Sequence, residues 1–410
     1  MTEPVVTERV LTERVLTERV LTEHVVAAPP ARLRPARRGP VPLLFLIADT
    51  GGGHRSAARA VAEALERRYP GRFAPVLCDP LGGPGSAWPL RLVTGWYGPV
   101  IRRAPWLWGA AYHACDSRPA MWLLERTLLR LATEPVSAAA RVHRPAAVVS
   151  FHPLTGGAAV AARDRAVPAA PVITVVTDLA RMHAAWRSAA PEVLVAPAPV
   201  MTAGRLSHRD SGQSRHRDRG RPRDRDGGGT LTGWPPVTGR FAAGPASRAE
   251  RLSLRRSLGL AEQRFLVLLL GGGEGSGGLG RRARAILRRF PDAGVVVVCG
   301  HNGRLQRRLG PRAERSGGRL RVTGYTGDMA ALLRCCDLLV TKAGPGAIAE
   351  AACCGAPMLL SSRLPGQEAG NIGVVTAAGA GRPARSVRRL LAEIGALRHD
   401  PGQLEAMRAA

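Results

Sequence analysis

One local pattern occurs three times in the sequence and limits what the chain can fold into: an apolar run of strand length, a glycine-rich turn, and a helical pattern. The three strand-and-turn pairs are Val41–Ala48 with Asp49–His54, Phe265–Leu270 with Gly271–Gly275, and Leu338–Thr341 with Ala343–Gly346. Continuous apolar runs that alternate with helices are typical of parallel sheets covered on both faces. We therefore predict an α/β protein with doubly wound sheets.

The length of 410 residues exceeds one typical domain and favours two. Two Rossmann-like halves are predicted, at residues 41–203 and 230–410, with a ligand cleft between them. Between the halves, residues 204–229 consist mainly of Arg, Asp, Gly and Ser without apolar periodicity, so we expect a disordered insertion. Residues 1–40 combine a five-residue repeat with a Pro/Arg-rich part and are expected to be a disordered extension.

The formal net charge of +28 favours anionic partners, such as nucleic acid, anionic lipid or a phosphorylated substrate. Lys342 is the only lysine, so the excess is almost all arginine, and a purely compositional origin stays open. Nucleic acid is not an expected partner, because the Arg-rich tract 204–226 lacks the aromatic residues on which bases stack.

The seven cysteines are scattered or form adjacent pairs, at Cys335–Cys336 and Cys353–Cys354, which is not the spacing of a zinc site or a disulfide framework. We expect reduced thiols, no metal and a cytoplasmic location. No apolar run reaches the length of a spanning helix, so any membrane contact should be peripheral. Residues 88–130 mix five of the seven tryptophans with arginine, which is typical of an interfacial segment; tryptophan as core filler is the alternative.

The first glycine turn, with Gly52 and Gly53, opens a helix at His54. Glycines allow close approach of a ligand, and a helix N-terminus disfavours a cation, so His54 is predicted to be neutral and able to act as a base. A capping role is the alternative. The second turn lacks the Gly-Lys-Ser/Thr ending of a P-loop and a clean G-x-G-x-x-G, which argues against ATPase and NAD chemistry.

The third turn is the most specific. Gly344 and Gly346 precede a helix and predict an anion-binding loop, and Glu350 lies one turn into that helix, where a carboxylate can accept hydrogen bonds from ribose hydroxyls. Downstream, Pro365–Asn371 concentrates amide and acid groups after a strand, which suits sugar hydroxyls.

These motifs resemble the monogalactosyldiacylglycerol synthase family, which is related to the processive diacylglycerol glucosyltransferases and to the cell-wall N-acetylglucosaminyltransferase that makes lipid II. The resemblance runs from about residue 42 to the C-terminus, without 204–229, and rests on Asp49–His54, Thr177–Leu179 with His183 and Trp186, Thr323–Tyr325, Thr341–Ala351 and Pro365–Asn371. It implies a GT-B fold, in which two Rossmann-like domains face a central cleft, and an inverting transfer without a catalytic metal or cofactor. A UDP-sugar is the implied donor, and a diacylglycerol-like lipid is the implied acceptor.

The resemblance also assigns residues. His54 matches the proposed base, with Asp178 as the alternative, and Gly52, Gly53, His183 and Trp186 lie on the acceptor side. The nucleotide-sugar group comprises Gly272, Gly273, Tyr325, Met329, Gly344, Gly346, Glu350, Gln367, Glu368 and Asn371. His152–Pro153 also matches the family, with no role assigned.

The expected function is hexose transfer from a UDP-sugar to a diacylglycerol-like lipid, by an enzyme peripheral to an anionic membrane surface at the inner face of the cell membrane. Alternatives are a UDP-N-acetylglucosamine transferase that uses another lipid or a small-molecule acceptor, a nucleotide-sugar epimerase of the same fold, an NAD-dependent oxidoreductase and a non-catalytic binding relative.

Overall fold

The computed structural model describes residues 39–49, 52–189, 191–200, 229–261 and 264–410. The predicted extension 1–40 and insertion 204–229 lie outside these residues, apart from Gly39, Pro40 and Gly229. Contacts divide the chain into two compact units: the first takes in the described residues up to Pro236 except Ile101–Gly109, and the second takes in the rest.

The first unit is built on a six-stranded parallel sheet in the order β2-β1-β3-β4-β5-β6. Its strands are β1 Val41–Leu46, β2 Phe73–Cys78, β3 Ala147–Ser150, β4 Val172–Val175, β5 Val193–Ala196 and β6 Gly229–Thr232. The second half was predicted to begin at residue 230, yet β6 pairs with β5 in the first sheet, with Thr230 beside Leu194. The boundary therefore lies later, between Pro236 and Val237.

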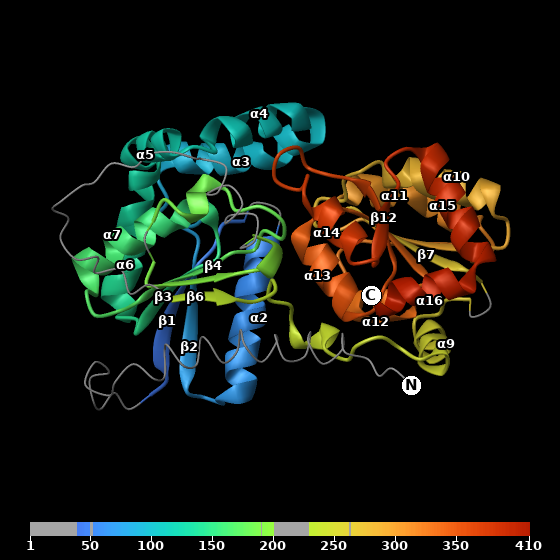
Figure 1. Ribbon diagram of the computed structural model, residues 1–410, viewed down its shortest axis with the longest axis horizontal. Helices are drawn as coiled ribbons and strands as arrows, with labels where there is room; N and C mark the ends of the chain where they lie inside the picture. Colours follow the sequence, from blue (N-terminus) through green and yellow to red (C-terminus); the bar gives the residue numbers. More distant parts are fainter. Residues whose placement is uncertain (1–38, 50–51, 190, 201–228, 262–263) are drawn as a thin grey trace, which may run out of the picture. The chain divides into compact units, whose positions relative to one another are not determined.

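Helices cover both faces of this sheet, as the continuous apolar strands predict. Helix α2 lies on one face, and α6 and α7 lie on the other (Figure 1). Alternate residues of β1 divide between the two cores: Leu43 and Phe45 pack with α2, and Leu44 and Leu46 pack with α6 and α7. The helices of this part of the chain are α2 Gly53–Arg68, α3 Trp88–Arg103, α4 Pro105–Cys115, α5 Arg118–Thr127, α6 Thr133–His143 and α7 Gly156–Ala166. By their contacts, the end of α3 and the first half of α4, within Ile101–Gly109, belong to the second unit.

The second unit has its own six-stranded parallel sheet, in the order β12-β11-β10-β7-β8-β9. The strands are β7 Leu266–Leu270, β8 Gly294–Val298, β9 Leu320–Thr323, β10 Leu338–Lys342, β11 Met358–Ser362 and β12 Gly381–Pro383. The helices are α9 Arg248–Ser257, α10 Leu279–Arg289, α11 Gly303–Glu314, α12 Met329–Cys335, α13 Pro345–Cys353, α14 Asn371–Ala377, α15 Val387–His399 and α16 Pro401–Ala409.

In both sheets the chain changes direction beside the first strand. After β1 and β2 the chain crosses to β3 on the other side of β1, and after β7, β8 and β9 it crosses to β10 on the other side of β7. Ligands of open α/β sheets bind beyond the carboxyl ends of the strands at such a switch point. The glycine turns that follow β1, β7 and β10 are therefore where binding sites are expected.

The tryptophans of residues 88–130 are not core filler. Four of the five, Trp88, Trp96, Trp106 and Trp122, are between 56% and 71% exposed, and Trp108 is half-buried. Leu92, Val93 and Leu123 are also exposed on the same helices. Within the parts of the chain that the structure describes, no helix combines the length and the apolar character needed to cross a bilayer.

Candidate active site

His54 is the centre of a buried polar cluster in the first unit. Helix α2 begins at Gly53 after Gly52, whose φ of 82° is the left-handed conformation that favours glycine. The His54 ring is buried, and its Nδ1 lies 2.7 Å from the carbonyl oxygen of Phe151 and 3.1 Å from Oγ1 of Thr177. The segments that follow β1, β3 and β4 thus meet at one imidazole.

The Phe151 carbonyl fixes the tautomer of His54. A carbonyl oxygen only accepts hydrogen bonds, so Nδ1 carries the hydrogen and donates it, and Nε2 keeps its lone pair. Burial lowers the pKa of His54 to about 4, against the opposing effect of the bond to Phe151. This low pKa agrees with the predicted neutral imidazole. Its principal cause is desolvation, whereas the sequence suggested the helix dipole.

A second histidine lies directly beside the first. The His152 ring meets that of His54 edge-on, with centroids 4.5 Å apart and an interplanar angle of 72°. His152 Nδ1 accepts a hydrogen bond from the backbone N–H of Leu154. Burial and the neighbouring His54 lower the pKa of His152 well below its ordinary value, so both rings are neutral at neutral pH.

The acceptor-side residues lie on the segment after β4 and are held by the protein. Trp186 Nε1 donates to Oδ2 of Asp178 at 2.7 Å, and both side chains are buried. His183 Nε2 donates to the carbonyl oxygen of Tyr112 at 3.0 Å, and its Nδ1 accepts from the N–H of Ala185. Contact of these side chains with an acceptor, and a role for Asp178 as base, stay predictions.

Sequence reasoning missed an acidic pair at the carboxyl ends of β1 and β2. Arg55 binds both carboxylate oxygens of Asp49, at 2.6 and 2.5 Å, which lowers the pKa of Asp49. Asp79 accepts hydrogen bonds from the N–H groups of Asp49, Leu81 and Gly82. The signal was Asp79 directly after an apolar run and before Gly82–Gly83. Asp49, Arg55, Asp79 and Gly82–Gly83 line a hollow of about 460 Å³ beside the first glycine turn.

In the second unit the turn after β7 is tightly folded. Gly272 and Gly275 have φ of 68° and 55°, and Gly275 N–H donates to the carbonyl of Gly272. The carbonyl of Gly273 accepts from the N–H of His301, which fastens this turn to the one after β8. A Cβ at Gly300 would lie 2.3 Å from that carbonyl oxygen, so the two turns approach as closely as glycine permits.

Glu350 has the environment expected of a ligand-binding carboxylate. Gly344 is the N-cap of α13, Glu350 lies one turn after Gly346 in that helix, and a Cβ at Gly346 would meet nothing within 4 Å. Burial raises the pKa of Glu350 to about 7, partly opposed by the positive charge of Arg240. Among the described residues its carboxylate has no hydrogen-bond partner, which leaves it available to ribose hydroxyls.

Glu368 and Asn371, predicted to contact the sugar, are buried and bonded within the protein. Glu368 is 3% exposed, forms an ion pair with Lys342, and accepts from the N–H of Leu364 at 2.8 Å. Asn371 Nδ2 donates to the carbonyl of Ala343 at 2.8 Å. These bonds tie the 364–371 loop to the turn after β10, while Gln367 is half-buried.

Tyr325, predicted to lie near the nucleotide base, is 66% exposed. Its ring stacks on His301, with centroids 5.1 Å apart and planes 15° from parallel. Met329 is half-buried at the start of α12. The stacked pair offers a flat surface of the kind on which a planar base can lie.

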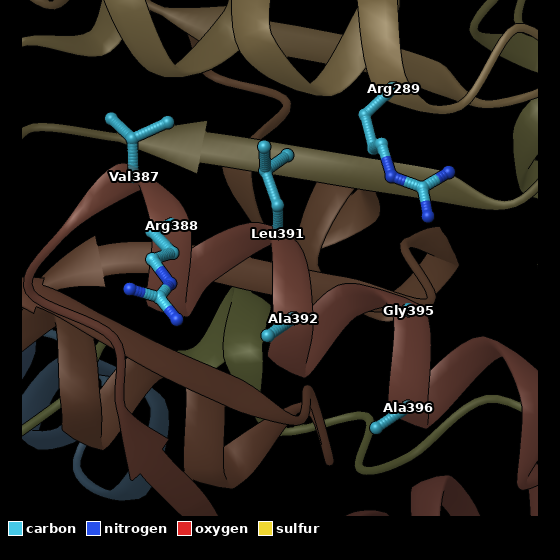
Figure 2. Close-up of a pocket in the computed structure, with 7 residues that line it drawn as sticks. All are labelled: Arg289, Val387, Arg388, Leu391, Ala392, Gly395 and Ala396. Carbon is cyan, nitrogen blue, oxygen red and sulfur yellow. The ribbon is translucent and has the colours of Figure 1, made fainter.

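Figure 2 shows another hollow of the second unit, of about 620 Å³, between α10 and α15. Its lining consists of Arg289 from α10 and Val387, Arg388, Leu391, Ala392, Gly395 and Ala396 from α15. It contains no acid, amide or imidazole group and none of the predicted site residues. We therefore place the candidate site at the glycine turns and not here.

Two family models and several known proteins are similar to this chain. A family model described as monogalactosyldiacylglycerol (MGDG) synthase matches residues 54–203, and the glycosyltransferase family 28 C-terminal domain matches residues 266–365. The probable chloroplastic monogalactosyldiacylglycerol synthase 2 of Oryza sativa subsp. japonica is 30% identical over 355 residues, which cover 83% of this chain and 70% of that protein. Chloroplastic monogalactosyldiacylglycerol synthase 1 of Arabidopsis thaliana is 28% identical, over 86% and 63%.

Solved structures with the same fold include HepE of Anabaena in complex with UDP and glucose, with a TM-score of 0.51, 16% identity, and coverage of 90% of this chain and 93% of that one. MurG of Acinetobacter baumannii has a TM-score of 0.51 and 15% identity, over 90% and 94%. UDP-GlcNAc 2-epimerase of Neisseria meningitidis has a TM-score of 0.54 and 13% identity, over the same shares. The predicted two-domain GT-B fold is confirmed. The chain is a glycosyltransferase, and it belongs to the monogalactosyldiacylglycerol synthase family.

Proposed function

We propose that the protein transfers a hexose from a UDP-sugar to the hydroxyl group of a diacylglycerol-like lipid, with inversion at the anomeric carbon. The relatives named as monogalactosyldiacylglycerol synthases support the lipid acceptor. The UDP and glucose in the HepE structure support the donor class. The residues of the two units supply the groups that this reaction needs.

His54 is the base in this proposal, and one observation carries it: the Phe151 carbonyl occupies Nδ1 and leaves Nε2 as a proton acceptor. The lipid oxygen attacks the anomeric carbon as the bond from that carbon to the UDP oxygen breaks. The hydroxyl proton passes to Nε2 of His54, and UDP leaves with the bonding electrons. Asp178, whose carboxylate is bound by Trp186, is the less suitable base.

The second unit holds the donor. Glu350 accepts the ribose hydroxyls, and the backbone at Gly344 and Gly346 with the N-terminus of α13 stabilises the diphosphate as negative charge develops on it. Tyr325 and Met329 lie at the uracil. The turn at Gly272–Gly273 and the loop that carries Gln367 and Asn371 surround the sugar.

The exposed face of α3 to α5 is proposed to rest on an anionic membrane surface, at the inner face of the cell membrane. Exposed tryptophans lodge at headgroup depth, and arginines such as Arg91 and Arg126, with Arg130 just after α5, pair with lipid phosphates. Burying such side chains against a bilayer brings the enzyme to an acceptor that does not leave the membrane.

The test is incubation of the purified protein with a panel of labelled UDP-hexoses and UDP-N-acetylglucosamine, with diacylglycerol in anionic vesicles. We expect label from one UDP-hexose in a glycolipid, and less of it by a factor of about 10²–10⁴ with His54→Ala. Label transferred only from UDP-N-acetylglucosamine would favour that transferase instead. Interconversion of UDP-sugars without an acceptor would favour an epimerase.

A further inference from the structure

Lys342, the only lysine of the chain, lies at the end of β10 between two glycine turns. A Cβ at Gly272 would lie 2.8 Å from Cε of Lys342, and one at Gly344 would lie 3.0 Å from its Nζ. Both glycines therefore let the backbone close around the lysine. The position lies at the carboxyl ends of β7 and β10, where the chain order of the sheet reverses.

The partner of Lys342 is a buried carboxylate. Lys342 Nζ donates to Oε1 of Glu368, whose other oxygen accepts from the N–H of Leu364. The lysine side chain is 29% exposed and that of Glu368 only 3%. An ammonium group has three hydrogens, and Glu368 is its single acceptor among the residues that the structure describes, so the outer side of the ammonium can bind a further anion.

The turns around Lys342 suit a diphosphate. Gly344 caps α13, whose N-terminal N–H groups favour an anion, and the buried charge of Glu368 would repel a diphosphate if Lys342 did not neutralise it. A lysine is also better suited to this place than an arginine. The methylene groups of Lys342 pass close to Gly272 and end in a compact ammonium. The planar guanidinium of an arginine would need more room there.

We propose that Lys342 is the cation that binds the diphosphate of the donor, and that Glu368 holds it in position while the site is empty. When the donor binds, the ammonium turns from Glu368 toward the phosphate oxygens, so Glu368 competes with the diphosphate for Lys342. This inference rests on the proposed UDP-sugar donor. It gives Glu368 the role of a positioning residue in place of the predicted contact with the sugar.

The alternative is an ion pair that only joins the 364–371 loop to β10, and calorimetry distinguishes the two. UDP and uridine are titrated into the full-length wild type, Lys342→Met, Glu368→Gln and the double variant. Because UDP lacks the hexose that is transferred, any contact between Glu368 and that hexose does not affect the measurement. Arg382→Met is the matched control. Arg382 lies on the edge strand β12 and also pairs with a buried carboxylate, that of Glu393 in α15.

We expect Lys342→Met to weaken UDP binding about 10-fold to 100-fold and to leave uridine binding unchanged. Glu368→Gln, which keeps an acceptor for Leu364, should bind UDP at least as tightly as wild type, because the competitor for Lys342 is gone. The double variant leaves no unpaired buried charge, so it should fold even where Lys342→Met does not, and it should bind UDP weakly. Arg382→Met should match wild type.

Two results would overturn the inference. In the first, Lys342→Met, or the double variant if Lys342→Met does not fold, binds UDP as wild type does. In the second, Glu368→Gln weakens UDP binding as much as Lys342→Met, which is the result of a merely structural pair. A wild-type protein that binds neither UDP nor uridine would overturn the proposed donor as well, so the two failures are distinguishable.

Discussion

The pH dependence of turnover follows from the burial of His54. Its pKa of about 4 means that the base stays unprotonated far below the range of an ordinary histidine. At pH 5 an imidazole with the usual pKa near 6.5 would be about 3% neutral, whereas His54 would be about 90% neutral. We therefore expect kcat to stay nearly constant from pH 8 to pH 5 and to fall only as the pH approaches 4.

Two other effects of pH must be separated from this one. Glu350, with a pKa of about 7 in the empty site, becomes protonated below neutral pH, so KM for the donor should rise there; kcat is therefore measured with saturating donor. Stability also changes with pH, because between the two pKa values His54 binds a proton in the unfolded chain and not in the folded one. The folded state loses about 2 kcal/mol from this residue between pH 7 and pH 5.

The assay is kcat at saturating donor and acceptor from about pH 4 to pH 8, with circular dichroism at each pH to confirm that the enzyme is folded. His54→Ala should lower kcat about 10²–10⁴-fold and abolish the acidic fall near pH 4. A titration of kcat near pH 6.5 in the folded enzyme would refute this account of His54, and wild-type kcat in His54→Ala would remove it from catalysis altogether.

Two of the remaining predictions concern single residues, and the third concerns a pair of exposed tryptophans. Glu350→Ala should weaken UDP binding by about 2 kcal/mol, or about 30-fold, because a charged hydrogen bond to ribose is lost; unchanged affinity by calorimetry would take Glu350 out of the site. Asn371→Ala leaves the buried carbonyl of Ala343 without its donor and should lower the free energy of unfolding by about 1–3 kcal/mol in urea titrations, and a smaller loss would show that the bond matters little. Replacing the exposed Trp88 and Trp96 by Ser should reduce co-sedimentation with anionic vesicles without lowering the melting temperature; equal sedimentation would argue against this face as the docking surface.

The sequence was sufficient for the strands that carry a continuous apolar run. Val41–Ala48 and Phe265–Leu270 gave β1 and β7 within two residues, because a strand buried on both faces has no polar positions. Four strands were not predicted. β2 contains Pro75, and β6, β9 and β12 are short and carry polar residues or proline. Pairing with a neighbouring strand gives each of them its conformation, and such pairing is a tertiary effect.

The candidate site could be proposed from the sequence where its signals are local. His54 and Glu350 became candidates because each lies on a helix that follows a glycine turn, and their roles stay predictions. The partners of His54 could not be placed, since Phe151 and Thr177 are 97 and 123 residues away and are brought together only by the order of the strands. The pair of Lys342 and Glu368 spans 26 residues and two loops, which no spacing rule predicts.

The function proposed for this glycosyltransferase combines a UDP-hexose donor, a diacylglycerol-like acceptor and His54 as the base. The most direct measurement is the anomeric configuration and yield of glycolipid formed from labelled UDP-hexoses and diacylglycerol in anionic vesicles, by wild type and by His54→Ala. The account predicts a single glycolipid with the anomeric configuration opposite to that of the donor, and a loss of about 10²–10⁴-fold in the variant. A product that retains the donor's configuration, or a release of UDP without any glycolipid from every hexose tested, would contradict it.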